Sequence, residues 1–162
     1  MKILLVAVLF LANAPAFAQS KPDEDQVNLL VDDLIASFNS HDFKTLEVNS
    51  TKDVSWVNMM GRWWKGRDEV VSAHKEIFNK IFNGVKFEKK SVSMRFLSAD
   101  IVVVHVIEHV DAFFPPDGVD RGGNKRPASD DNLQLVYLKT NGKWLLSAAH
   151  NTEVQPGGPP VK

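Results

Sequence analysis

The spacing of apolar residues changes once along this chain, near Gly84, and that change constrains the fold more than any other feature. Before it, apolar residues recur at intervals of three and four, as they do on one face of a helix. After it, they alternate every second residue, as in strands with one buried face. Helical segments followed by a run of strands are typical of an α+β domain with an antiparallel sheet, rather than of alternating parallel units.

The two patterns predict the individual elements. Helices are expected at 22–39, 43–46 and 67–83. Strands are expected at 54–60, 85–96, 101–110, 133–139 and 143–152. The parity of the apolar residues shifts across 89–91, which predicts a β-bulge. Asn141-Gly142 lies between two apolar runs, and this pair is a strong signal of a tight hairpin.

The two ends of the chain are expected to lie outside the folded domain. Residues 1–18 have a positive start at Lys2, a short apolar run and an Ala-x-Ala site, the features of a cleaved signal peptide. The apolar run is about half the roughly 20 residues that a membrane span needs. We therefore expect a protein exported to the periplasm or secreted, without membrane contact after cleavage. The domain should span 19–154, and 155–162 should form a flexible tail.

Composition excludes several kinds of site. The chain has no cysteine, so its stability must come from packing, and thiol or zinc–thiolate chemistry is excluded. Its 19 basic and 20 acidic residues form no basic stripe, so no nucleic-acid partner is expected. Neither a phosphate-binding glycine loop nor a dinucleotide fingerprint occurs, and no cofactor is predicted.

Two segments carry a family resemblance: the run from Trp56 through Asn58, Gly66 and the third helix to His74, and the ending 148–152, Ala-Ala-His-Asn-Thr. With the element order, they resemble the nuclear transport factor 2-like superfamily, in its SnoaL-like branch and the SgcJ/EcaC family. The resemblance implies a cone: three N-terminal helices packed on a curved antiparallel sheet, with a cavity open at one end. Members isomerise steroids, cyclise polyketides, dehydrate small molecules, bind ligands or associate with proteins, so it implies a pocket but no particular reaction.

His74 is the first candidate for chemistry. Helical spacing places it on the apolar face of the third helix, and its side chain should therefore point toward the cavity. A histidine can act as acid or base near neutral pH, with Asn58 or Tyr137 orienting a carbonyl group. The alternative is a core histidine satisfied by one hydrogen bond.

Two enzyme sites of the superfamily are not expected. The helix at 22–39 lacks the tyrosine that a ketosteroid isomerase-like oxyanion hole requires. A polyketide cyclase-like site needs an inward acid, and no carboxylate is expected to face the cavity. In particular, Glu108 should point away from it.

The cavity wall is expected to be aromatic with a few polar groups, as in many small-molecule pockets, although aromatic residues are equally common in a core. The candidate ligand-binding residues are Trp56, Trp63, Trp64, Phe78, His105 and His150. By alternation, Trp63 and Trp64 must diverge, and only one of His150 and Asn151 faces inward.

A string at 105–109, His-Val-Ile-Glu-His, matches a zinc-protease pattern, but that pattern requires a helix. In a strand the two histidines are roughly 13 Å apart, so no metal site is expected.

Two further expectations concern the surface. Residues 113–130 form a long connection in which Phe113 and Phe114 lie beside prolines, and it is either a hydrophobic lid or simply a mobile loop. Val102, Val104 and Val106 are expected on the sheet face that the helices leave bare. Because that face would need a cover, we expect a homodimer.

The sequence therefore predicts an exported SnoaL-like domain that binds a small, largely apolar molecule. It leaves open whether the domain is also an enzyme, with isomerase, cyclase or hydratase-like activity based on a histidine. The rival is a non-catalytic association or scaffold module whose cavity is filled by its own aromatic residues. An open cavity that reaches His74 would favour the first.

Overall fold

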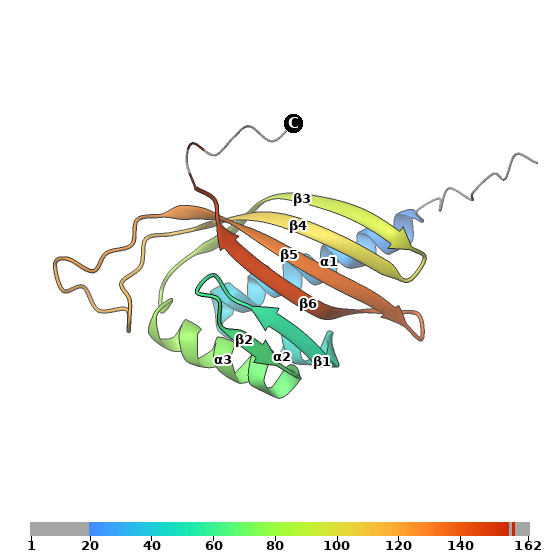
Figure 1. Cartoon of the computed structure of the whole chain (residues 1–162), viewed down its shortest axis with the longest axis horizontal. Helices are drawn as coiled ribbons and strands as arrows, with labels where there is room; N and C mark the ends of the chain where they lie inside the picture. Colours follow the sequence, from blue (N-terminus) through green and yellow to red (C-terminus); the bar gives the residue numbers. More distant parts are fainter. Residues whose placement is uncertain (1–19, 156, 158–162) are drawn as a thin grey trace, which may run out of the picture.

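The computed structural model describes residues 20–155 and 157. Within them, a six-stranded curved sheet lies across the helices (Figure 1). The predicted signal peptide at 1–18 and most of the predicted tail lie outside the described residues. Among the helices of the described part, none is long and apolar enough to cross a membrane.

The helices lie on one face of the sheet (Figure 1). They are α1 (Lys21–Ser40), α2 (Lys44–Val48) and α3 (Arg67–Lys80). In α1 a proline in the first turn is followed by acidic residues, which suit the positive end of the helix dipole. The apolar stripe of α1 is buried, and the helix ends at His41, whose φ of 58° is left-handed. The α+β class and the cone-like arrangement are thus confirmed.

The strands are β1 (Ser50–Val57), β2 (Trp63–Lys65), β3 (Phe87–Ser98), β4 (Ile101–Val110), β5 (Ser129–Thr140) and β6 (Lys143–Glu153). Their order in the sheet is β2-β1-β6-β5-β4-β3. From β3 to β6 the strands form the antiparallel meander that was predicted. However, β1 pairs with β6 in parallel, so the expectation of a wholly antiparallel sheet is wrong at this pairing. The pairing of β1 with β6 depends on where α3 and the meander place these two strands. The local spacing of apolar residues carries no information about that.

Two local predictions are confirmed. The pairing of β3 with β4 shifts register between Lys89 and Ser91, which is the predicted bulge. At the β5–β6 turn, Asn141 and Gly142 both have positive φ, 52° and 77°. A two-residue hairpin of this type requires positive φ at both positions, and asparagine and glycine adopt it most readily.

The two faces of β4 are the reverse of the prediction. Val102, Val104 and Val106 are fully buried, in one core cluster with Val27 and Val31 of α1. The helices therefore cover these valines within a single chain, and the reason given for a homodimer is wrong. The homodimer itself stays a prediction.

Candidate functional site

A cavity of about 620 Å³ lies between α3, the β1–β2 hairpin and the inner face of β4, β5 and β6. Its wall is mostly aromatic and aliphatic, with a small number of polar groups. Ligand pockets commonly enclose roughly 300–1,000 Å³, so the volume suits a small organic molecule. The described residues that line it include Phe38, Trp56, Asn58, Met60, Arg62, Trp64, Ala73, His74, Phe78, Phe82, Glu108, Phe113, Pro115, Arg126, Asp131, Leu133 and Asn151.

Aromatic rings enclose His74 on several sides. The imidazole lies edge-on to the indoles of Trp56 and Trp64, with ring centroids 4.4 and 5.2 Å away. It is stacked with the rings of Phe38 and Phe78, each at 6.0 Å. This packing holds the ring in one orientation and excludes bulk water from most of its surface.

The hydrogen bonding of His74 defines its tautomer. Nδ1 lies 2.7 Å from the carbonyl oxygen of Val70, one turn earlier in α3. Because a carbonyl oxygen only accepts, Nδ1 carries the proton and Nε2 is left with a lone pair. Burial lowers the pKa of His74 to about 4, with the Val70 hydrogen bond acting in the opposite direction. At neutral pH the imidazole is therefore uncharged and accepts through Nε2.

The sequence reasoning missed a pair of carboxyl groups in the same cavity. Glu108 of β4 and Asp131 of β5 are directly opposite each other in the antiparallel ladder, and they are only 3 % and 4 % exposed. Burial, and then the charge of Asp131, raises the pKa of Glu108 to about 8. Burial also raises the pKa of Asp131. Oε2 of Glu108 and Oδ1 of Asp131 have no hydrogen-bond partner among the described residues.

Asn151 links this pair to the aromatic wall. The Trp56 indole N–H donates to Asn151 Oδ1 at 3.2 Å, and Asn151 Nδ2 donates to Asp131 Oδ2 at 3.4 Å. The indole donor thereby orients the amide so that its NH₂ group faces the carboxylate. Asn151 is the inward member of the His150–Asn151 pair.

The mouth of the cavity combines charged and apolar groups. Glu76 and Lys80 form an ion pair at 2.8 Å on α3, and Arg62 and Arg126 line the mouth without an ion pair among the described residues. Phe113 of the 111–128 connection packs against Phe82, with ring centroids 4.8 Å apart.

The same connection also contacts the C-terminal end of α3. A Cβ at Gly118, where φ is +83°, would lie 2.5 Å from the Lys80 carbonyl oxygen, so the close approach requires glycine. The predicted lid residues thus border the cavity, while closure of the connection over the mouth remains a prediction.

The structure brings five of the predicted site residues together in the cavity: His74, Asn58, Trp56, Trp64 and Phe78. The side-chain oxygen of Asn58 accepts from the backbone N–H groups of Met60 and Arg62, each at 3.0 Å. Asn58 therefore shapes the β1–β2 turn, in addition to lining the wall.

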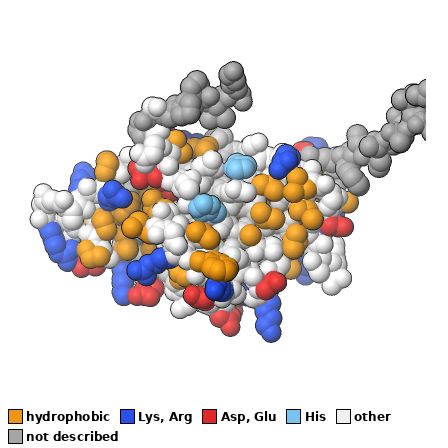
Figure 2. Space-filling model, viewed as in Figure 1, with side chains coloured by type: hydrophobic (Ala, Val, Ile, Leu, Met, Phe, Trp, Pro, Cys, Tyr) orange, Lys and Arg blue, Asp and Glu red, His pale blue; other side chains and the backbone are white. Residues whose placement is uncertain are grey.

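Three other predicted ligand contacts lie on the outer, convex face of the sheet. Trp63 is 57 % exposed, with its N–H donating to Ser55 and the Lys65 ammonium 3.9 Å from the ring centre. His105 and His150 flank Gln134 in the ladder and are exposed (histidine side chains are visible on this face in Figure 2). Both histidines were expected to face inward. This is wrong, because the other alternate set of residues in β4 and in β6 faces the helices.

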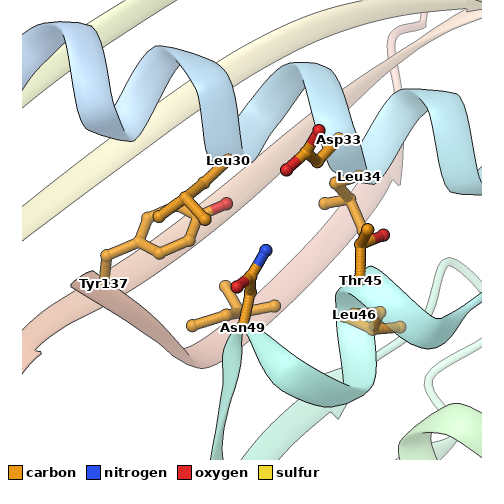
Figure 3. A pocket seen from close by; sticks show the side chains of 8 residues that line it. Leu30, Asp33, Leu34, Thr45, Leu46, Asn49 and Tyr137 are labelled. Atoms are coloured by element: carbon orange, nitrogen blue, oxygen red, sulfur yellow. The ribbon is translucent and has the colours of Figure 1, made fainter. Parts of the chain in front are cut away.

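Tyr137 belongs to a different part of the interior. It borders a space of about 10 Å³ together with Leu30, Asp33, Thr45 and Asn49, and Figure 3 shows its ring pointing toward α1. Burial, and then the charge of Asp33, raises the pKa of its phenol. Tyr137 is not among the residues that line the large cavity with His74. The structure therefore does not support the expectation that Tyr137 works beside His74.

The inward carboxyl groups correct a second expectation, that no acid faces the cavity. Glu108 has the same strand parity as the buried valines of β4, and Asp131 has that of Leu133 and Leu135. The other alternate set of β5 residues contains the polar Gln134. Its polarity could have shown that the set with Leu133 and Leu135 faces inward. The zinc-protease pattern at 105–109 lies in a strand, as expected, and the described residues contain no cluster of three side chains able to hold a metal ion.

A cone formed by a curved sheet over helices, with one deep cavity beside α3, defines a nuclear transport factor 2-like domain. The sequence model of the SnoaL-like domain matches residues 27–151, and the chain belongs to that family. This match does not separate the SgcJ/EcaC branch from the rest, so that finer assignment stays a prediction.

Solved structures support the fold. A Caulobacter vibrioides protein of uncharacterised function with a cystatin-like fold is 28% identical, with a TM-score of 0.76, and the match covers 82% of this chain and 90% of that one. A Streptomyces avermitilis member of the NTF2-like family, named as a candidate dehydratase, is 22% identical, with a TM-score of 0.67 and coverage of 84% and 99%. A type 2 hexachlorocyclohexane dehydrochlorinase is 14% identical, with a TM-score of 0.69 and coverage of 86% and 95%. A comparison with curated protein sequences finds no match.

Proposed function

We propose that the cavity beside α3 binds a small, largely apolar organic molecule. The observation that carries this proposal is an open space of about 620 Å³ that reaches His74 and has aromatic walls with few polar groups. The rival function, an association module with a filled cavity, has less support because the aromatic side chains leave this space open.

The same cavity could support acid/base chemistry through His74. Its Nε2 atom carries a lone pair at neutral pH and makes no hydrogen bond with the described residues. We propose that this nitrogen accepts a hydrogen bond or a proton from the bound molecule, the first step of an isomerase, cyclase or hydratase-like reaction. Two solved structures of this fold are named for enzymes, a candidate dehydratase and a dehydrochlorinase, which favours a catalytic use of the cavity.

Binding of a simple aromatic probe tests the proposal. Naphthalene is titrated into the protein while tryptophan emission is followed, because Trp56 and Trp64 line the cavity. In parallel, native mass spectrometry of the gently purified protein tests for a bound molecule that is lost on denaturation. We expect saturable quenching by naphthalene.

A matched pair of variants locates the binding. Ala73 lines the cavity, so Ala73→Phe should fill it and weaken naphthalene binding at least tenfold. Ala36 is exposed on α1, and Ala36→Phe should leave the affinity unchanged. The proposal is wrong if naphthalene does not bind and no molecule co-purifies, or if both variants bind as the unchanged protein does.

Export and dimerisation are part of the same proposal. The sequence of residues 1–18 supports export, and N-terminal sequencing of the protein from a secreting host should begin at Gln19. The homodimer would now have to use the convex face, where half-buried Val103, Ile107 and Val136 lie around exposed histidines. Light scattering at micromolar concentration tests it, and a monomer would overturn it.

A further inference from the structure

We propose that Glu108 and Asp131 form the polar recognition point of the cavity and bind an uncharged hydroxyl or carbonyl group of the ligand. This inference rests on the proposed function, that the cavity takes a small apolar molecule, and deepens it by naming the class of that molecule. It is an uncharged alcohol or ketone with an apolar body, rather than a carboxylate or an amine.

The geometry places the two carboxyl groups side by side. They are direct cross-strand neighbours on the inner face of β4 and β5, and in an antiparallel pair such residues have Cβ atoms about 4.5–5.5 Å apart. Both line the cavity, although only 3 % and 4 % of their surfaces are exposed, the part that faces the cavity included. A ligand in the cavity would therefore reach the two carboxyl groups through the small parts of their side chains that border it.

Each carboxyl group has an unused oxygen. Glu108 Oε2 and Asp131 Oδ1 are buried without a hydrogen-bond partner among the described residues. Buried polar atoms in proteins nearly always have a hydrogen-bond partner. Two unpaired oxygens on adjacent side chains therefore indicate that a partner is missing. A polar group on the ligand would supply it after rotation of a carboxyl group brings its oxygen to the cavity surface.

The pair is expected to hold one proton near neutral pH, because two adjacent buried carboxylates repel each other. Glu108 is the group that keeps it, since its pKa is raised to about 8. Burial raises the pKa of Asp131, whereas the hydrogen bond that it accepts from Asn151 favours its ionised form. The pair thus presents one O–H donor beside one acceptor, which matches an alcohol through both contacts and a ketone through the donor.

The charged groups around Glu108 do not neutralise the pair. On β3, Lys89 is opposite Glu108, but it forms an ion pair with Asp32 of α1. Across the cavity, His74 of α3 is uncharged at neutral pH.

The neighbours of Asp131 leave it without a cation as well. On its own strand, Asp130 is bound by Lys90 and His109, and on β6 Glu153 adds another negative charge opposite Asp131. Arg62 and Arg126 are at the mouth, where they would oppose entry of a cation, whereas Lys80 is paired there with Glu76. An anion would be repelled at the pair itself, which leaves an uncharged group as the best match.

Five probes with the same aromatic body separate these possibilities: naphthalene, 2-naphthylmethanol, 2-acetylnaphthalene, 2-naphthoate and 2-naphthylmethylamine. Their dissociation constants are measured by calorimetry at pH 6.5 and at pH 9. At pH 6.5 we expect the alcohol to bind about tenfold more tightly than naphthalene, with the ketone close behind and both ions weaker. At pH 9 the ketone should lose its advantage, because Glu108 has lost the proton that it donates.

Three variants locate the effect. Glu108→Gln and Asp131→Asn should each reduce the advantage of the alcohol to about threefold or less. Saturable binding of naphthalene by both variants shows that they are folded, and the advantage of the alcohol is taken relative to naphthalene in the same variant. Asp130→Asn is the matched control, since its side chain is on the convex face, and it should retain the full advantage.

The outcomes separate the two proposals. If none of the five probes binds, the proposed function fails and this inference fails with it. If naphthalene binds but the alcohol and the ketone gain nothing, the inference alone is overturned. Tightest binding by the amine, strengthening toward pH 9, would also overturn it, because the pair would then be a doubly ionised site for cations.

Discussion

The two ends of the space beneath the sheet differ although the same strands and helix α1 border both. Around Tyr137, where residues of α1, α2, β5 and β6 meet, the remaining space is only about 10 Å³ (Figure 3). That is about the volume one water molecule needs. Beside α3, the space is about 620 Å³. We call them the closed end and the open end.

Polar groups at the two ends differ in the same way. At the closed end, Asp23 accepts hydrogen bonds from Lys139 at 2.6 Å and from the Trp144 indole at 2.8 Å. At the open end, Glu108 and Asp131 each have a buried oxygen without a partner within residues 20–155. The closed end is thus organised for stability, whereas the open end retains hydrogen-bonding capacity that a ligand can use.

The largest expected effect is the pH dependence that Glu108 adds at the open end. Its pKa is raised from 4.5 to about 8, so the folded protein holds a proton that the unfolded chain releases between these values. Stability should therefore fall as pH rises from 4.5 to 8, by up to roughly 5 kcal/mol. Urea unfolding from pH 5 to 9 should show this fall in the unchanged protein.

Glu108→Gln should remove that part of the fall and be more stable than the unchanged protein at pH 9. Glu88→Gln, at an exposed position on β3, is the control and should keep the original profile. Identical profiles for the unchanged protein and Glu108→Gln would show that Glu108 titrates in the ordinary range.

A pair of leucines on β5 compares packing at the two ends. Leu135 and Leu133 are both fully buried, but only Leu133 lines the large cavity. Leu135→Ala must create a new void and should cost about 4 kcal/mol. Leu133→Ala merely extends a space that already exists and should cost about 2 kcal/mol. Urea unfolding at pH 6 measures both, and equal costs would mean that the open end is as tightly packed as the rest of the core.

The same contrast explains what the sequence could predict. The hairpin at Asn141-Gly142 and the inward position of His74 depend on residues close together in the chain, and the structure has both. The face of β4 could not be decided locally, because Ile101 to Val104 are apolar on both faces. It depends on which set of valines α1 covers, and this is a contact between distant segments.

The open end was the least predictable region for the same reason. Glu108 and Asp131 become a pair only through the register of β4 with β5, and Asn151 joins them only through β6. The prediction assigned the wrong alternate set of β4 residues to the cavity. It therefore placed His105 inside the cavity and Glu108 outside it, the reverse of the structure. A single error of parity therefore exchanged a predicted site residue for an unpredicted one.

His74 should give the opposite pH dependence to Glu108. Its pKa is lowered from 6.5 to about 4, so the unfolded chain takes up a proton first as pH falls. Stability should be fully present above pH 6.5 and decrease toward pH 4, by up to roughly 3 kcal/mol. Unfolding of His74→Leu should lack this decrease, whereas His150→Gln, at an exposed position, should retain it. A decrease that survives in His74→Leu would assign it to another group.

The smallest expected effect is at the closed end, in the contacts of Asp23. Hydrogen bonds, first from Lys139 and then from Ser20 and Trp144, lower the pKa of this carboxyl from 3.8 to about 2. Its contribution should therefore be complete above pH 3.8 and be lost as pH falls through 2. Because the ion pair is partly exposed to solvent, Asp23→Asn should cost only about 1 kcal/mol at pH 7.

Asp25→Asn is the matched control for Asp23, since Asp25 pairs with Lys21 on the exposed surface of the same helix turn. It should change stability by less than about 0.5 kcal/mol. Chemical unfolding of both variants at pH 7 measures the difference, and naphthalene affinity should be the same in both. A loss of naphthalene binding in Asp23→Asn would show that the two ends are coupled through α1, and the separation between a stabilising end and a binding end would then be wrong.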